Sequence, residues 1–182
     1  MNLRLVIASS YVPGFVKRRK LGELLCRTAD AFGVAPPDLT GTSFRECLGL
    51  FAAFTRDQAE NAYRNEAPTR TIHSRLRSTA YEFGKKIKHT LKIDSRADVM
   101  RAARLLYTML GIDFDGGADG RILIRRCYFS DIYSPHVCAL ISALDEGMLM
   151  GLAGGGRLEF ASRITEGSDC CRAIFYFEEK RP

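Results

Sequence analysis

Apolar residues recur every three or four positions along most of residues 15–110, which is the spacing of amphipathic helices. Ser43 with Glu46, and Ser95 with Asp98, have the three-residue spacing of helix-capping pairs. Glycine or proline follows three of the four apolar stretches and should end those helices. The predicted helices are residues 15–32, 43–65, 69–92 and 95–110.

The apolar pattern changes from helical spacing to alternation after residue 120, which predicts strands at residues 121–129, 158–164 and 171–177. In the first strand, Leu123, Cys127 and Phe129 share one side, but Arg125 lies on that side too, so the pattern leaves the buried face open. A shorter alternation at residues 3–7 predicts a further strand. Residues 113–120 are rich in aspartate and glycine but lack the spacing of a calcium loop, so we expect a turn that leads into the sheet.

A further helix is predicted between the first two C-terminal strands, because Pro135 suits a first helical position and Ser134 precedes it as a cap. Its apolar stripe consists of Val137, Leu140, Ile141, Leu144 and Met148. The predicted fold class is α+β, with N-terminal helices packed on a small antiparallel sheet and a helix inserted between its strands. We expect residues 1–182 to form one domain, mainly helical over 1–113, with residues 121–178 carrying the site.

A second stripe on this helix contains residues that can carry chemistry. Cys138, Ser142 and Asp145 are spaced so that they share one helical face. Cys138 lies in the first turn, where free backbone N–H groups and the helix dipole favour a thiolate. His136 lies in the same turn and is a candidate proton carrier. The alternative is that Cys138 is a small buried apolar side chain, as most free cysteines are.

The chain has six cysteines and a formal net charge of +6. No secretion signal precedes the cysteines, so we interpret them as thiols or ligands rather than as a disulfide framework. Residues 69–92 carry seven basic side chains against one acidic side chain. Such a run suits an anionic partner, but it is more often the solvated face of a helix, and we expect no nucleic-acid partner. No apolar run approaches the ~20 residues of a membrane span, so we expect a cytoplasmic protein without membrane contact.

Residues of the C-terminal half follow an order seen in a known family. Cys127 precedes Cys138 and Asp145, then come the run Phe160-x-x-Arg163-x-Thr165-x-Gly167 and Cys171. This order resembles the L-2-amino-thiazoline-4-carboxylic acid hydrolase family over roughly residues 70–178. The resemblance implies a ring-opening hydrolase that converts a cyclic isothiourea acid to N-carbamoyl-cysteine.

The same resemblance suggests a role for each residue. Cys138 is the candidate nucleophile, and Asp145 or His136 is the candidate proton carrier. Arg163 is the candidate clamp for a substrate carboxylate, because a guanidinium binds a carboxylate at two points. The remaining candidate substrate-binding residues are Ser142, Cys127 and Cys171.

Two alternatives stay open at this stage. Cys127, Cys138 and Cys171 could together hold a soft metal such as zinc that activates water. Alternatively, the strand, Gly-x-x-x-Cys and aromatic strand at the C-terminal end resemble vinyl-reductase-type small-molecule-binding domains. That resemblance implies a sensor or carrier of a small ligand without catalysis. In those domains a cysteine commonly occupies the position of Arg163, which is a departure from the pattern.

Overall fold

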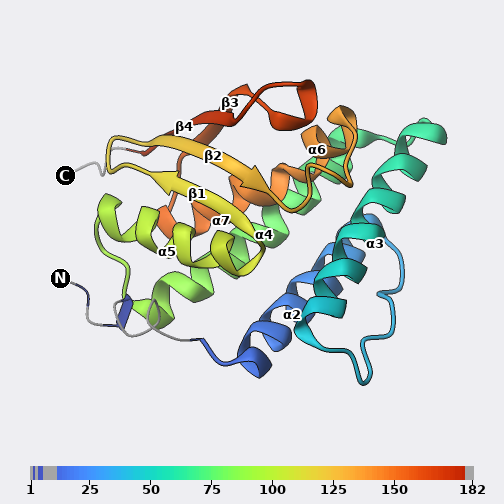
Figure 1. The fold of residues 1–182 in the computed structure, drawn as a ribbon, viewed down its shortest axis with the longest axis horizontal. Helices are drawn as coiled ribbons and strands as arrows, with labels where there is room; N and C mark the ends of the chain where they lie inside the picture. The colour runs from blue at the N-terminus through green and yellow to red at the C-terminus, as the bar shows by residue number, and fades with distance from the viewer. Residues whose placement is uncertain (1, 3, 6–11, 179–182) are drawn as a thin grey trace.

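The computed structural model describes residues 2, 4–5 and 12–178 of the chain. Its helices and strands, labelled as in Figure 1, confirm the predicted α+β class. The helices are α2 (Gly14–Phe32), α3 (Phe44–Arg64), α4 (Thr69–Leu91), α5 (Arg96–Met109), α6 (Pro135–Ile141), α7 (Ala143–Ala153) and the short 3₁₀ helix η1 (Ile164–Glu166). The strands are β1 (Ile112–Gly116), β2 (Arg121–Cys127), β3 (Arg157–Ser162) and β4 (Cys171–Tyr176).

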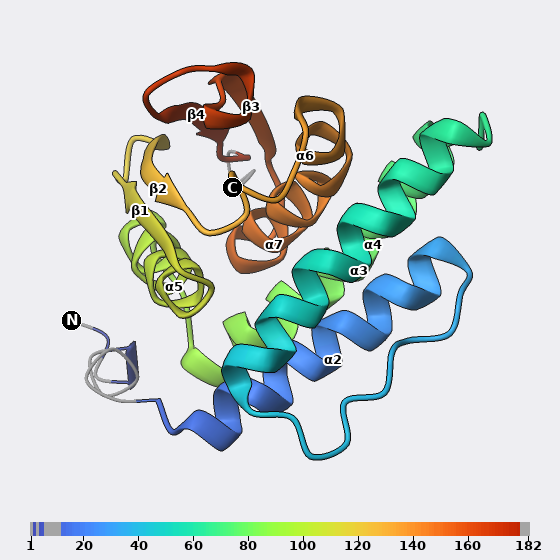
Figure 2. The same ribbon diagram turned by 45° about the vertical axis from the view of Figure 1, so that its right-hand side comes forward.

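The four strands form one antiparallel sheet in the order β1-β2-β4-β3. Helices α6 and α7 lie in the chain between β2 and β3, as the inserted helix was expected to do. Figure 2 places α7 between the sheet and α4, and Figures 1 and 2 show α2 and α3 as neighbouring helices away from the sheet. One continuous cluster of buried apolar side chains joins the helices to the inner face of the sheet.

Glycines allow α4 and α7 to cross at short range. A Cβ atom on Gly147 would meet the backbone carbonyl oxygen of Arg77, and one on Gly151 would meet that of Tyr81. On the opposite helix, a Cβ on Gly84 would meet the carbonyl oxygen of Met148. Because backbone atoms cannot move aside as a flexible side chain can, these positions fix how closely α7 is held between α4 and the sheet.

The four N-terminal helices occupy the predicted ranges to within a few residues. The Ser43 side chain accepts a hydrogen bond from the Glu46 amide, and the Glu46 carboxylate accepts one from the Ser43 amide. Ser95 likewise accepts a bond from the amide of Asp98 at 3.1 Å. These local pairs satisfy backbone N–H groups that a helix start leaves free, which is why the helix starts could be predicted.

The helix predicted from Pro135 to Met148 is interrupted at Ser142, which ends α6 and precedes α7. The Ser142 hydroxyl donates a hydrogen bond to the carbonyl oxygen of Ala139 at 2.9 Å. Such bonds from serine back to the preceding turn compete with the helical pattern and bend helices. The interruption leaves Cys138 on α6 and Asp145 on α7.

The sequence-based prediction of a turn at residues 113–120 missed strand β1. Ile112 and Phe114 alternate with Asp113 and Asp115, and only the two apolar side chains are buried. The strand lies at the edge of the sheet and is only five residues long. Short edge strands with charged side chains are common because they discourage pairing with other chains, but their composition is that of a turn.

The sequence pattern left the inner face of β2 open, and in the structure Ile122 and Ile124 rather than Leu123 are buried. The register with β1 shifts at Arg125, which has no partner residue on β1. This β-bulge reverses the alternation after Ile124, so Cys127 returns to the inner face. Leu123 and Cys127 therefore lie on different faces, although simple alternation puts them on the same side.

A second bulge lies in β3, where Ala161 has no partner on β4 between the pairs formed by Phe160 and Ser162. Phe160 pairs with the buried Ala173, whereas Ser162 pairs with an exposed residue of β4. Arg163 therefore follows on the inner side of the sheet. Ile164, predicted as the end of this strand, begins the 3₁₀ helix η1 instead.

Contrary to the expectation that no apolar segment approaches the length of a membrane span, residues 135–153 are long and apolar enough by length and composition, but 61% of the tested window is buried inside the structure. The core helix of a globular protein meets the same test, so this is weak support for a membrane span. The basic side chains of α4 lie mostly on its exposed side, as a solvated face requires. The strand predicted at residues 3–7 lies outside the described residues, apart from Arg4 and Leu5.

Candidate functional site

A cavity of about 110 Å³ lies between the inner face of the sheet and helices α5, α6 and α7. Most of its wall is apolar and includes Phe51 of α3, Ile124 of β2 and Leu144 of α7. Six residues predicted as site residues line it: Cys127, Cys138, Ser142, Asp145, Arg163 and Cys171. The fold thus brings together side chains from four elements and the start of η1.

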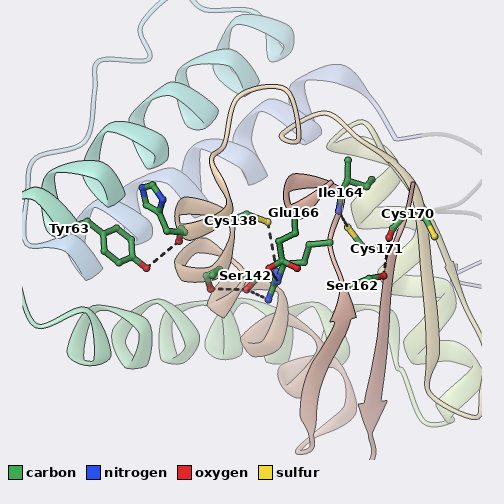
Figure 3. A network of polar contacts seen from close by, with 11 residues as sticks. Tyr63, Cys138, Ser142, Ser162, Ile164, Glu166, Cys170 and Cys171 are labelled. Carbon is green, nitrogen blue, oxygen red and sulfur yellow. Dashed lines mark hydrogen bonds and ion pairs between the residues drawn. The ribbon is translucent and has the colours of Figure 1, made fainter. Parts of the chain in front are cut away.

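Arg163 supplies the positive charge of this cavity, and its side chain is only 14% exposed. Its guanidinium donates to the Ser142 hydroxyl at 3.1 Å and to the Cys138 sulfur at 3.7 Å. Figure 3 shows the contacts that join Cys138, Ser142 and Glu166 at this point. The Glu166 carboxylate is 3.7 Å from Arg163 Nε and half exposed, so it neutralises the charge only weakly.

The Arg163 guanidinium also lies 3.8 Å from the centre of the Phe160 ring. A cation over an aromatic face is attracted by the electrons of that face, most strongly where water is excluded. Phe160 and Arg163 share the inner side of β3 because of the bulge at Ala161. The bulge at Ala161 therefore places the guanidinium at the cavity and against the face of the Phe160 ring.

Asp145 is the acid of the cavity, and it accepts a hydrogen bond from the Tyr107 hydroxyl at 2.7 Å. Burial raises the pKa of Asp145 from 3.8 to about 6, although the Tyr107 bond and the charge of Arg163 both act to lower it. Desolvation therefore outweighs the two favourable interactions. Burial and the Asp145 charge raise the pKa of Tyr107 well above its usual value, so Tyr107 remains a hydrogen-bond donor.

The three cysteines of the cavity differ in their surroundings. Burial raises the pKa of Cys127 to about 12, and burial also raises the pKa of Cys171. Both therefore remain thiols near neutral pH and act as small apolar wall residues. The Cys171 sulfur accepts the backbone N–H of Ile164 at 3.4 Å, whereas the Cys138 sulfur faces the Arg163 guanidinium.

His136, the other predicted proton carrier, does not line the cavity and is exposed. Its ring lies 3.2 Å from the Ser134 hydroxyl and packs edge-on against the ring of Tyr63, with ring centres 4.9 Å apart. Two positions along a helix turn a side chain by roughly 200°, so His136 and Cys138 point in nearly opposite directions. The structure therefore separates the histidine from the thiol that it was predicted to serve.

The alternative prediction was a zinc site with three of the cysteines as ligands. Cys127, Cys138 and Cys171 do reach the same cavity. Across residues 2, 4–5 and 12–178, however, no group of three or more histidine, cysteine or acidic side chains is arranged to hold a metal ion. The raised pKa of Cys127 also opposes metal binding, since a cysteine ligand must lose its proton.

The sequence reasoning missed the two tyrosines of the site and gave no role to Phe160, although Phe160 belongs to the run that ends at Gly167. Tyr107, Tyr133 and Phe160 line the cavity, and Tyr133 is also hydrogen-bonded to the buried hydroxyl of Thr55. Tyr107 stacks on Phe114 of β1 with ring centres 4.8 Å apart. A tyrosine on the buried side of a predicted helix needs a polar partner, which is the signal that could have pointed to Tyr107 and Asp145.

Comparison with known proteins overturns the resemblance drawn from the C-terminal motifs. No family model matches the chain, and no curated protein matches it. The assignment to the L-2-amino-thiazoline-4-carboxylic acid hydrolase family, with its link to vinyl-reductase-type domains, is therefore wrong. One solved structure is similar, an H-NOX protein from S. oneidensis in the Fe(II)NO ligation state. The match covers 98% of this chain and 100% of the other, at 16% identity and a TM-score of 0.42. This identity and this TM-score are too low to demonstrate a shared fold or function.

Proposed function

We propose that this chain is a small-molecule-binding domain that senses or carries its ligand without catalysis. The observation that carries the proposal is a largely apolar cavity with one cation, Arg163, and a few convergent polar groups. Binding sites for small molecules combine an apolar wall with a small number of placed polar side chains. The ligand that fits this wall is small and apolar and bears one anionic group, such as a carboxylate.

Electrostatics favours an anion at Arg163. The ion pair of this mostly buried guanidinium with the half-exposed Glu166 spans 3.7 Å and neutralises its charge only weakly, and a ligand carboxylate would add a two-point contact. Asp145 does not prevent this, because its pKa of about 6 means that its charge is easily removed. A carboxylate arriving at Arg163 would favour the protonated form of Asp145 further.

Binding fits the geometry better than catalysis. A cysteine nucleophile requires a base held against it, and His136 points away from Cys138. The Cys138 sulfur accepts a hydrogen bond from the Arg163 guanidinium, which cannot accept a proton. Asp145, the other candidate proton carrier, already accepts a hydrogen bond from the Tyr107 hydroxyl.

Benzoate is a suitable first probe, because it combines an apolar ring with one carboxylate. Its binding can be followed by methyl NMR of Ile112, Ile124 and Ile141, all of which line the cavity. We expect these methyl signals to shift, while that of Ile174, 39% exposed on the outer face of the sheet, stays unchanged. Absence of any shift at the three cavity isoleucines, with benzoate and with benzene, would refute the proposal.

Replacing the cation tests the polar part of the proposal. Arg163→Gln should weaken benzoate binding by about 10- to 100-fold, since hydrogen bonds to charged groups contribute about 1.5–3 kcal/mol. Arg121→Gln is the matched control, because its side chain is 84% exposed and is not among the residues that line the cavity. Benzene, which lacks the carboxylate, should bind both variants and the original protein alike.

A further inference from the structure

A second apolar cavity, of about 210 Å³, lies beside the first between α2, α4 and α5. Val16, Phe83, Ile87 and Met109 are among the residues that line it. Four side chains line both cavities: Leu24 of α2, Leu106 of α5, Leu110 at the end of α5 and Met148 of α7. These four side chains form one apolar wall between the two cavities, here called the shared wall. We call the first cavity the inner cavity and the second the outer cavity.

The shared wall consists of side chains that can adopt other positions. Met148 is unbranched, with three rotatable bonds, and fills irregular gaps in cores. Leu106 and Leu110 are only partly buried, so neither is locked by close packing on every side. A modest change of rotamers would therefore join the two cavities, without any movement of the backbone that the glycine contacts of α4 and α7 hold in place.

Size supports a ligand that occupies both spaces. The first cavity, at about 110 Å³, is somewhat smaller than the ~150 Å³ cavity that is known to hold benzene, so a single ring such as that of benzoate already fills it and a longer hydrocarbon tail has to extend beyond it. With the second cavity the space becomes long and apolar, and Arg163 lies at its inner end. At the other end, Lys17, Lys20 and Lys86 line the outer cavity, and long basic side chains cover apolar surface while their charges reach water.

The distribution of charge fixes the direction of such a ligand. Glu23 accepts ion pairs from Lys20 at 3.1 Å and from Lys86 at 3.7 Å, so two of the outer lysines already have a carboxylate. Arg163 also has a carboxylate, Glu166 at 3.7 Å, but its side chain is only 14% exposed, against 45% for Lys20 and 57% for Lys86, so water screens its charge less. An anionic head group therefore gains more at the inner end than at the outer end.

We propose that the ligand is a straight-chain monocarboxylic acid, with its carboxylate at Arg163 and its hydrocarbon tail passing the shared wall into the outer cavity. This rests on the proposed function and names its ligand class. Each methylene that enters the outer cavity leaves water for an apolar surface, at about 0.8 kcal/mol each. That corresponds to a dissociation constant about fourfold lower per methylene.

Isothermal titration of the full chain with butyrate, hexanoate, octanoate and decanoate tests the proposal. We expect one-to-one binding whose affinity continues to rise through decanoate. In methyl NMR, decanoate should shift both Ile141 of the inner cavity and Met109 of the outer cavity, and butyrate should shift Ile141 alone. If benzoate and butyrate bind but affinity stops rising at hexanoate and Met109 never shifts, the ligand class is wrong while the proposed function stands. If none of these acids binds, both fail.

A variant with a larger side chain in the outer cavity distinguishes binding of the hydrocarbon tail in that cavity from nonspecific association of long-chain acids with the protein. Val16 lines only the outer cavity and is partly buried, so Val16→Trp should weaken decanoate binding at least tenfold and leave butyrate binding unchanged. Val34→Trp, at an exposed position outside both cavities, is the matched control and should change neither. Met109→Phe offers a second way to fill the outer cavity if Val16→Trp folds poorly. Equal decanoate affinity in all folded variants would overturn the proposal.

Discussion

The most specific prediction concerns how Asp145 makes the stability of the protein depend on pH, because its carboxyl lies at the wall of the cavity and its ionisation is unfavourable. Burial raises its pKa from 3.8 to about 6 in the folded protein. The folded state therefore binds this proton more tightly than the unfolded chain does. It follows that the free energy of unfolding falls as pH rises from about 4 to about 6 and stays reduced above that range.

Asp145→Asn should remove this pH dependence, because an amide cannot ionise and can still accept the hydrogen bond from Tyr107. The full difference between the two pKa values corresponds to about 3 kcal/mol. Asp145 is only partly buried by accessible area, and solvent screening reduces the effect, so we expect the variant to be about 1–3 kcal/mol more stable at neutral pH. Near pH 4, where the original carboxyl is protonated, the two proteins should be about equally stable.

Urea unfolding of both proteins between about pH 4 and about pH 8 measures the difference directly, since all other titrating groups are common to both. Asp131→Asn, which removes an exposed carboxylate, is the matched control and should leave the pH profile of stability unchanged. A stability difference between the original protein and Asp145→Asn that does not change with pH would refute the account of Asp145. A variant that is less stable at neutral pH would refute it as well.

Three further predictions concern the helices and the thiols. Gly147→Ala should lower the free energy of unfolding by about 1–3 kcal/mol in urea titrations, because the added Cβ meets the backbone of α4, whereas Gly14→Ala, with open space around it, should not. Ser43→Ala should cost about 1 kcal/mol by the same measurement, because it removes the capping bond at the start of α3. Iodoacetamide at about pH 8 should label the exposed Cys26 rapidly and Cys127 only after unfolding, as followed by mass spectrometry. The reason is that burial raises the pKa of Cys127 to about 12. Rapid labelling of Cys127 in the folded protein would contradict this.

The helical part of the fold could be predicted because its signals are local. A capping pair such as Ser43 and Glu46 spans three residues, and an amphipathic stripe is complete within one helix. The edge strand β1 could not be predicted in this way. Its two aspartates and its glycine have the composition of a turn, and only the pairing with β2 makes the segment a strand.

The candidate site was predictable to the extent that it depends on helix geometry. Cys138, Ser142 and Asp145 were placed on one face from their spacing, and all three line the cavity despite the break at Ser142. The same geometry should have excluded His136, since residues two positions apart on a helix do not face each other. Proximity in sequence was mistaken for proximity in space.

The strand residues of the site depended on features that no local pattern contains. Arg125 and Ala161 are the extra residues of two bulges, and their position is defined only by the partner strands. Without the bulge at Ala161, Ser162 rather than Arg163 would continue the inner face begun by Phe160. The order of cysteines and the arginine that suggested a hydrolase therefore describes which residues reach a cavity wall, and it does not specify a reaction.

Three energetically unfavourable features lie together at one end of the structure. Both bulges lie near the C-terminal ends of β2 and β3, the mostly buried guanidinium of Arg163 is paired only with the half-exposed Glu166 among the described ion pairs, and the carboxyl of Asp145 is held where ionisation is unfavourable. An apolar core built for stability alone would avoid each of them, because buried charges and interrupted strands cost free energy. Features of this kind gather where a protein binds or reacts with something. Their concentration around one cavity is therefore the physical reason to look for the ligand there rather than at the basic face of α4, whose charges are mostly solvated and partly paired.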